Sequence, residues 1–136
     1  MHNEIGQYSC PVEATLDVIG GKWKGVILYK LLKRPRRFSE LKRELPAITQ
    51  RMLTLQLREL EEDGIVHREI YKEIPPKVEY SLTEFGKTLE PILLAMLTWG
   101  DQYTSQIVTR KSAQAATSLS SRVSSQMRNA LDVELL

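Results

Sequence analysis

The sequence predicts a mainly α-helical fold with a small antiparallel sheet of two to three strands. Apolar residues recur every three to four positions over most of residues 12–60, which is the period of an amphipathic helix. Two short runs with the composition of strands then flank a pair of prolines, and a long segment of helical period follows them. A chain of 136 residues is long enough for one domain with its own core.

The ends of the first two helices are marked by their residues. Cys10 is the predicted N-cap of the first helix, Pro11 is its first residue, and Gly20 and Gly21 end it. A second helix is expected over about residues 22–32, where apolar side chains repeat every four positions.

Two short helices are expected after a basic turn over residues 33–37. Ser39 is the predicted N-cap of the third helix, which Pro46 ends. Thr49 is the predicted N-cap of the fourth helix, which Gly64 ends. Two short helices joined by a tight turn form a helix-turn-helix, whose second helix reads DNA in many proteins.

A two-stranded wing is expected directly after these helices. Residues 65–73 and 77–82 have strand composition, and Ile74, Pro75 and Pro76 separate them. Two prolines exclude both a helix and a central strand at that point, so they mark a connection between the strands. The sequence therefore predicts a winged helix-turn-helix.

A last long helix is expected to begin after the N-cap Thr83 and to bend at Pro91, where one backbone donor is missing. From Lys111 onward the chain is rich in serine and lacks aromatic residues, so this tail is either a weak helix or mobile. We therefore expect a domain over residues 1–110 and a tail over residues 111–136.

Basic residues are concentrated between Lys22 and Arg58. Eleven lysines and arginines lie there against two acidic residues, which gives 11 − 2 = +9, whereas the whole chain carries +2. Such a segment is typical of a surface that binds phosphates, and the alternative is a solvated, charged helix face.

The helical period places the candidate DNA-reading residues on one side of the fourth helix. If Leu53, Leu57 and Leu60 face the core, the opposite side is polar and cationic in its N-terminal half. Arginine and glutamine form paired hydrogen bonds with guanine and adenine edges, and Leu55 either contacts a thymine methyl group or packs on a neighbouring element. The candidate DNA-binding residues of both short helices and the wing are Ser39, Lys42, Thr49, Gln50, Arg51, Thr54, Leu55, Arg58, Lys72 and Lys77.

Residues 48–82, ITQRMLTLQLRELEEDGIVHREIYKEIPPKVEYSL, closely resemble the HxlR family of bacterial regulators, which are MarR-like winged-helix proteins. The resemblance extends to residues 10–32 and 36–45, and through Tyr103. It implies a homodimer held by the first and last helices. It also implies one recognition helix per subunit in successive major grooves of double-stranded DNA, with the wings on the flanking backbone.

Apolar residues of the first and last helices give a separate argument for a homodimer. They offer more apolar surface than a small helical core can cover, and a two-fold dimer would bury them and set half-sites about 34 to 36 Å apart. The alternative is that they fill the core of one chain. The candidate interface residues are Val12, Leu16, Ile19, Met96, Trp99 and Tyr103.

Cys10 has two interpretations. At a helix N-cap the dipole favours a reactive thiolate, although Glu13 adds opposing negative charge one turn later. Some members of the resembled family sense quinones or oxidants through a cysteine at this Cys-Pro position. Cys10 is therefore either a sensor of redox or electrophile stress or a small structural cap, and the effector, a small molecule or an oxidant, is not identified by the sequence.

The sequence disfavours several other classes of protein. His2 and His67 lie far apart without a second cysteine, so no metal site is expected. The chain has no phosphate-binding loop and no nucleophile with a paired base, so we expect no catalytic residue, no cofactor and no enzymatic activity.

The longest apolar stretch, residues 91–97, is far shorter than the roughly 20 residues of a membrane span, and no signal-peptide pattern precedes it. We therefore expect a cytoplasmic regulator of transcription, a repressor or an activator, that binds an operator as a homodimer. The alternative is a winged-helix module that binds other proteins.

Overall fold

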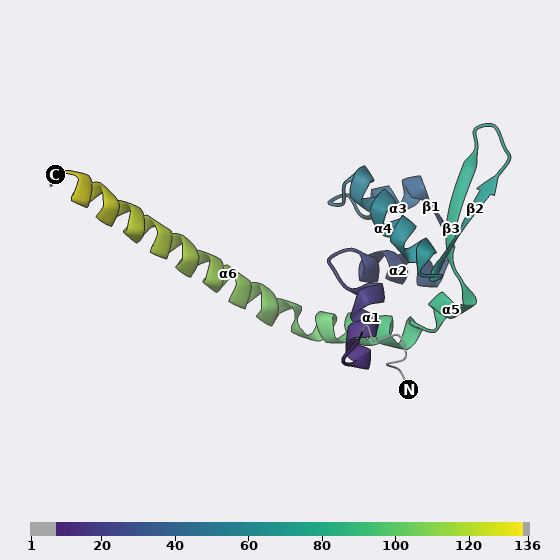
Figure 1. Cartoon of the computed structure of the whole chain (residues 1–136), viewed down its shortest axis with the longest axis horizontal. Coiled ribbons are helices and arrows are strands. Elements are labelled where there is room, and N and C mark those ends of the chain that lie inside the picture. The colour runs from purple at the N-terminus through teal and green to yellow at the C-terminus, as the bar shows by residue number, and fades with distance from the viewer. Residues whose placement is uncertain (1–7, 135–136) are drawn as a thin grey trace. The chain divides into compact units, whose positions relative to one another are not determined.

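The computed structural model describes residues 8–134, and His2 lies outside them (Figure 1). The chain divides into two units, one that ends at Ala95 and one that begins at Met96. The first unit contains α1 (Pro11–Ile19), α2 (Lys24–Lys33), β1 (Arg36–Arg37), α3 (Phe38–Glu44), α4 (Gln50–Glu62), β2 (Val66–Tyr71), β3 (Lys77–Leu82) and α5 (Glu84–Lys87). A long helix, α6 (Glu90–Glu134), begins in the first unit and forms the second. This confirms a mainly helical fold with a small antiparallel sheet.

The sheet has three strands in the order β1-β3-β2, with both neighbouring pairs antiparallel. The wing is the hairpin of β2 and β3, which projects away from the helices (Figure 1). Arg36 and Arg37 were expected in a turn, but they form β1 and pair with Tyr80 and Glu79 of β3. The prediction was wrong there because two residues are too few to show the alternation of a strand.

The core of the first unit is formed by side chains of α1, α2, α3 and α4, of β2 and β3, and of the start of α6. In α4, Leu53, Leu57 and Leu60 are fully buried, which confirms the predicted inward face of that helix. The core residues are Ile19, Ile27, Leu28, Leu31, Leu41, Leu45, Ile48, Leu53, Leu57, Leu60, Ile65, Val66, Tyr80 and Leu93. Because α4 packs on this core along one whole side, its other side is held outward.

Both ends of α4 lie where the sequence predicts them. The side chain of Thr49 accepts a hydrogen bond from the backbone N–H of Met52 at 3.1 Å, as expected of an N-cap. Gly64 has φ +75°, a left-handed conformation that favours glycine, and it reverses the chain into β2. The Thr83 hydroxyl donates to the carbonyl of Gly64 at 2.6 Å, which fixes the end of β3 against this turn.

Two predicted helix starts were wrong. Helix α3 begins at Phe38 with Arg37 as its N-cap, because the carboxylate of Glu40 accepts the Arg37 backbone N–H at 3.1 Å and replaces the expected cap by Ser39. Thr83 caps the short helix α5 rather than α6, with the Gly86 N–H donating to its hydroxyl at 2.9 Å.

Pro91 does not bend a helix as expected. It is the second residue of α6, at a position where a backbone N–H has no partner within the helix, so the proline marks the start of α6.

The second unit is the rest of α6, which continues as a helix to Glu134. Of the two alternatives for the tail, the structure therefore shows a helix. The rings of Trp99 and Tyr103 pack with centroids 5.2 Å apart near its beginning. None of the described helices combines the length and the apolar composition of a membrane span. The boundary at residue 110 stays a prediction, since the units divide at 95 and 96.

Candidate nucleic-acid interface

The outward side of α4 brings five predicted residues together. They line an open groove of about 650 Å³ and are Gln50, Arg51, Thr54, Leu55 and Arg58. All five are exposed. Among the described residues, Arg51 has no hydrogen bond or ion pair, so its guanidinium is available for an external acceptor.

Two hydroxyls of this helix are already engaged. Thr49 accepts from the Met52 backbone, and the Thr54 hydroxyl donates to the Gln50 carbonyl at 2.9 Å. Thr54 therefore has only acceptor capacity left for a second partner, while Thr49 fixes the start of the helix. Gln50 and Arg51 form the first turn of α4, where a recognition helix contacts bases.

The candidate residues of α3 lie in different environments. Ser39 is exposed in the first turn of the helix. Lys42 is half-buried, and its ammonium donates to the carbonyl of Pro46 at 3.4 Å, in the turn between α3 and α4. Lys42 thus closes the end of α3 and keeps its positive charge at the turn.

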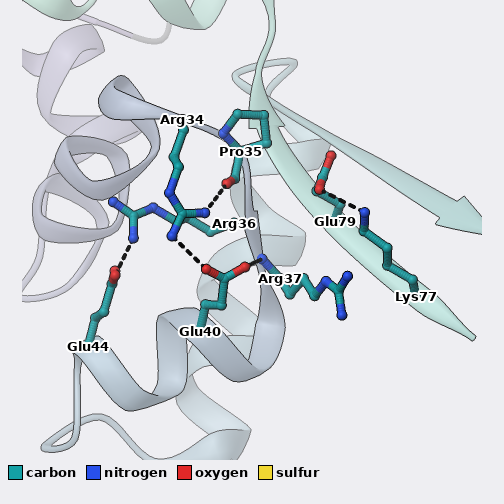
Figure 2. Close-up of polar contacts among 8 residues, drawn as sticks. All are labelled: Arg34, Pro35, Arg36, Arg37, Glu40, Glu44, Lys77 and Glu79. Atoms are coloured by element: carbon teal, nitrogen blue, oxygen red, sulfur yellow. Dashed lines mark hydrogen bonds and ion pairs between the residues drawn. The ribbon is translucent and has the colours of Figure 1, made fainter. Parts of the chain in front are cut away.

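The two wing lysines also lie in different environments. Lys77 lies 3.4 Å from a carboxylate oxygen of Glu79 (Figure 2). It also lies 4.7 Å from the ring centroid of Tyr71, so much of its charge is compensated. Lys72 is exposed beyond the end of β2, and within the described part of the chain it has no ion pair. Lys72 is therefore the more available of the two lysines for an ion pair with a phosphate.

The two glutamates of the basic segment both form ion pairs with arginines of the same segment. Arg34 contacts Glu40 at 2.7 Å, and the buried Arg36 forms an ion pair with Glu44 (Figure 2). The Arg34 guanidinium, with the Arg37 backbone N–H, lowers the pKa of Glu40 to about 2. These contacts tie the chain before α3 to α3 itself.

A further ion pair joins Lys24 of α2 to Glu59 of α4 at 2.7 Å, with the lysine buried. Glu40 and Glu44 are already included in the count of +9, so only the pair with Glu59, which lies outside the segment, lowers it further, to 9 − 1 = +8. Sequence spacing gives no signal for this pair, because its partners lie on different helices.

The candidate dimer residues lie in both units. In the first unit, Val12 and Leu16 are exposed, whereas Ile19 is 6% exposed and belongs to the core. Ile19 is thus better explained by the alternative, in which an apolar residue of α1 fills the core of one chain. In the second unit, Met96 and Trp99 are exposed and Tyr103 is half-buried.

Cys10 is exposed at the N-cap of α1, and its thiol is free. Its side chain makes no capping hydrogen bond, so the cap consists of the Glu13 N–H donating to the Cys10 carbonyl at 2.9 Å. The Glu13 carboxylate is engaged by the backbone and the hydroxyl of Ser9. No cluster of His, Cys, Asp and Glu suited to a metal ion occurs in residues 8–134.

Sequence reasoning missed two residues beside the groove. Arg68 of β2 and Tyr80 of β3 line a cavity together with Thr54 and Arg58 of α4. No sequence period relates a helix to a strand that follows it, so only the fold brings them together.

The chain is similar to known regulators over most of its length. It is 62% identical over 107 residues to the uncharacterized HTH-type transcriptional regulator YdeP of Bacillus subtilis, covering 79% of this chain and 84% of YdeP. The redox regulator HypR in its oxidized form is 69% identical, with a TM-score of 0.67 over 68% of this chain and 96% of HypR. The reduced form of the transcriptional regulator YodB from B. subtilis is 39% identical, with a TM-score of 0.61 over 71% of this chain and 95% of YodB.

The model of one family, described as HxlR-like helix-turn-helix, matches residues 18–108. The matched segment contains α2, α3, α4, the three strands and α5, which together form the helix-turn-helix and its wing. It also reaches into α6 and stops short of the serine-rich tail. The chain belongs to the HxlR-like helix-turn-helix family of winged-helix regulators.

Proposed function

We propose that this protein regulates transcription by binding an operator in double-stranded DNA as a homodimer. The observation that carries the proposal is the two-sided character of α4. One side is buried in the core. The other presents Gln50 and Arg51 at the N-terminal turn, and Arg51 forms no hydrogen bond or ion pair with any described side chain. Such a helix presents base-reading side chains in a fixed position, which is what major-groove recognition needs.

The wing supplies contacts of a second kind. Lys72 extends from the hairpin that follows α4 directly, and a lysine there neutralises backbone phosphates without reading sequence. Helix α4 therefore selects the operator, and the wing strengthens binding to any duplex.

A homodimer explains the apolar residues left exposed on each unit. Val12 and Leu16 on α1, and Met96 and Trp99 on α6, are large apolar side chains exposed in the single chain. An isologous interface would bury the same patch of both subunits and set two copies of α4 about 34 to 36 Å apart, one turn of DNA.

The test is selection of genomic fragments on the purified protein, followed by footprinting of the retained DNA. The proposal predicts two protected half-sites of related, inverted sequence with centres one helical turn apart. A single protected half-site would contradict the dimer. Absence of duplex binding at low salt would contradict the proposed function and favour a protein-interaction module.

A second proposal concerns regulation through Cys10, whose thiol is exposed and free. Among the solved relatives, HypR is a redox regulator with an oxidized and a reduced form, and YodB has a diamide-treated form. With one cysteine per chain, diamide can oxidise two Cys10 thiols of a dimer to one disulfide. The two thiols lose two electrons and two protons, and diamide takes them up as its hydrazine. A disulfide changes operator affinity only if it favours one conformation of the dimer.

The matched experiment compares the parent with Cys10→Ser in operator binding, with and without diamide, and measures dimer cross-linking without reductant. The parent is expected to form a diamide-dependent cross-link and to change its operator affinity, while Cys10→Ser does neither. Equal operator affinity of the oxidised and reduced parent would leave Cys10 as a structural residue of α1.

A further inference from the structure

A small cavity lies between α4 and the base of the wing, within the first unit. Its volume is about 160 Å³. The lining residues are Thr54, Leu57, Arg58 and Glu61 from α4, Arg68 from β2 and Tyr80 from β3. Apart from Leu57, every lining residue carries a polar group, and two of them are arginines.

The fold brings the two arginines to the same place from different elements. Arg68 lies directly opposite Tyr80 in the antiparallel ladder of β2 and β3, so both side chains lie on one face of the sheet. Tyr80 is 8% exposed and belongs to the core, so this face is the one that packs on the helices. Thr54 and Arg58 are four residues apart on α4 and share one side of it.

The cavity also shares lining residues with the groove that contains the predicted base-reading residues. Thr54 and Arg58 line both, while Gln50 and Arg51 line only the groove. A ligand that follows α4 from its first turn toward its last therefore reaches Arg58 and then the cavity. Duplex DNA is such a ligand, because its backbone runs alongside the bases.

The charges of the lining residues favour an anion. Among the described residues, neither Arg58 nor Arg68 forms an ion pair with a carboxylate, so the cavity has two positive charges against the single negative charge of Glu61. Burial raises the pKa of Tyr80 above its ordinary range, although Arg68 lowers it in part by its charge and a hydrogen bond. Tyr80 therefore stays neutral near pH 7 and keeps a hydroxyl proton to donate.

Size and polarity restrict the kind of anion. Pockets for drug-sized ligands are about 300 to 1,000 Å³ and mostly apolar, and this cavity is smaller and mostly polar. Guanidinium groups match the oxygens of a phosphate or a carboxylate through pairs of parallel hydrogen bonds. The two residues shared with the groove on α4 favour a phosphate of the DNA backbone over a free small anion.

We propose that this cavity binds one backbone phosphate of duplex DNA, held by the guanidinium groups of Arg58 and Arg68 and the hydroxyl of Tyr80. The proposal rests on the proposed function and adds Arg68 and Tyr80 to the DNA-contacting residues. Because a phosphate carries no sequence information, this contact fixes the position of α4 on the duplex without selecting bases.

The test uses a short random-sequence duplex and measures its affinity for the full chain between 50 and 200 mM salt. Arg68→Gln is expected to make the negative slope of log affinity against log salt shallower by about one. The affinity ratio of parent to variant then falls about fourfold over this range. Arg68→Lys is expected to keep the slope and lose affinity, since it keeps the charge but not the planar fork. Tyr80→Phe is expected to weaken binding slightly without changing the slope.

Arg122→Gln is the matched control, because it makes the same charge change at an exposed residue of α6. An Arg68→Gln slope equal to those of the parent and Arg122→Gln, in a variant with unchanged circular dichroism, would overturn the proposal. Saturable binding of inorganic phosphate or acetate without DNA, together with that unchanged slope, would identify a small-anion site instead. Failure of the parent to bind any duplex would count against the proposed function itself.

Discussion

Each unit of this protein has a helix with a stripe of apolar side chains along one side. The stripe in the first unit is buried, and the stripe in the second unit is exposed. In α4, Leu57 lies in a stripe of leucines and is 1% exposed, because α2 and the sheet cover it. In the second unit, four apolar side chains recur at every fourth residue of α6, and Leu119, the first of them, is 63% exposed. A helical period therefore reveals which side of a helix is apolar, but not whether anything covers it.

Truncation of one leucine from each stripe tests this difference most strongly. Leu57→Ala is expected to lower the free energy of unfolding by about 2 to 5 kcal/mol, because it removes buried surface and leaves a cavity. Leu119→Ala is expected to change it by no more than about 0.5 kcal/mol, as for exposed sites generally. Urea denaturation followed by circular dichroism measures both. A comparable loss in Leu119→Ala would show that the stripe on α6 is buried by another chain.

Glycine-to-alanine substitutions are expected to have opposite effects in the two units. A Cβ atom at Gly86 in α5 would lie 2.1 Å from the carbonyl oxygen of Ile65, so Gly86→Ala is expected to cost about 1 to 3 kcal/mol of stability. At Gly100 in α6, a Cβ atom would meet no atom of the described residues within 4 Å, and Gly100→Ala is expected to stabilise the helix by about 0.5 to 1 kcal/mol.

The thermal unfolding midpoint should therefore fall in Gly86→Ala and rise in Gly100→Ala. A destabilised Gly100→Ala would indicate close packing against Gly100 by a second chain. An unchanged unfolding midpoint in Gly86→Ala would mean that α5 and the start of β2 can move apart without loss of stability.

A smaller effect is expected from pH at the contacts before α3. The Arg34 guanidinium holds the pKa of Glu40 at about 2, below its ordinary 4.5, so folding favours the ionised carboxylate. This stabilisation is complete above pH 4.5 and is lost as the pH falls from 4.5 toward 2. The stability difference between the parent and Glu40→Gln should therefore shrink over that range, and salt should weaken it.

Glu62→Gln is the control for this experiment, since it makes the same charge change at an exposed residue of α4. Urea unfolding at several pH values separates the two variants. A difference between parent and Glu40→Gln that is independent of pH would refute the assigned ion pair with Arg34.

Local signals in the sequence predicted the parts of the fold that depend on neighbouring residues. The cap by Thr49, the stop at Gly64 and the proline after Cys10 each act within one helical turn, and the structure has all three. The burial of Leu53, Leu57 and Leu60 also followed from their spacing alone. The outward face of α4, and with it most of the candidate interface, was therefore predictable from the amino-acid sequence.

Features that depend on distant partners were not predictable in this way. The strand at Arg36 exists because β3 lies beside it, and Lys24 is neutralised by a glutamate of another helix. Thr83 and Pro91 gave valid start signals, but their spacing did not reveal that they begin two helices rather than one. The cavity with Arg68 needs the wing folded against α4, which no period in the sequence describes.

Whether α4 reads bases in an operator is tested by comparing the parent with Arg51→Ala on the selected operator and on a random duplex. Arg51→Ala is expected to weaken operator binding by about 1 to 3 kcal/mol and to relax the preference at one base position. Lys72→Ala, the wing control, is expected to weaken binding to both duplexes alike. Equal losses of Arg51→Ala on operator and random DNA would contradict base reading by α4, because Arg51 would then contact only the backbone.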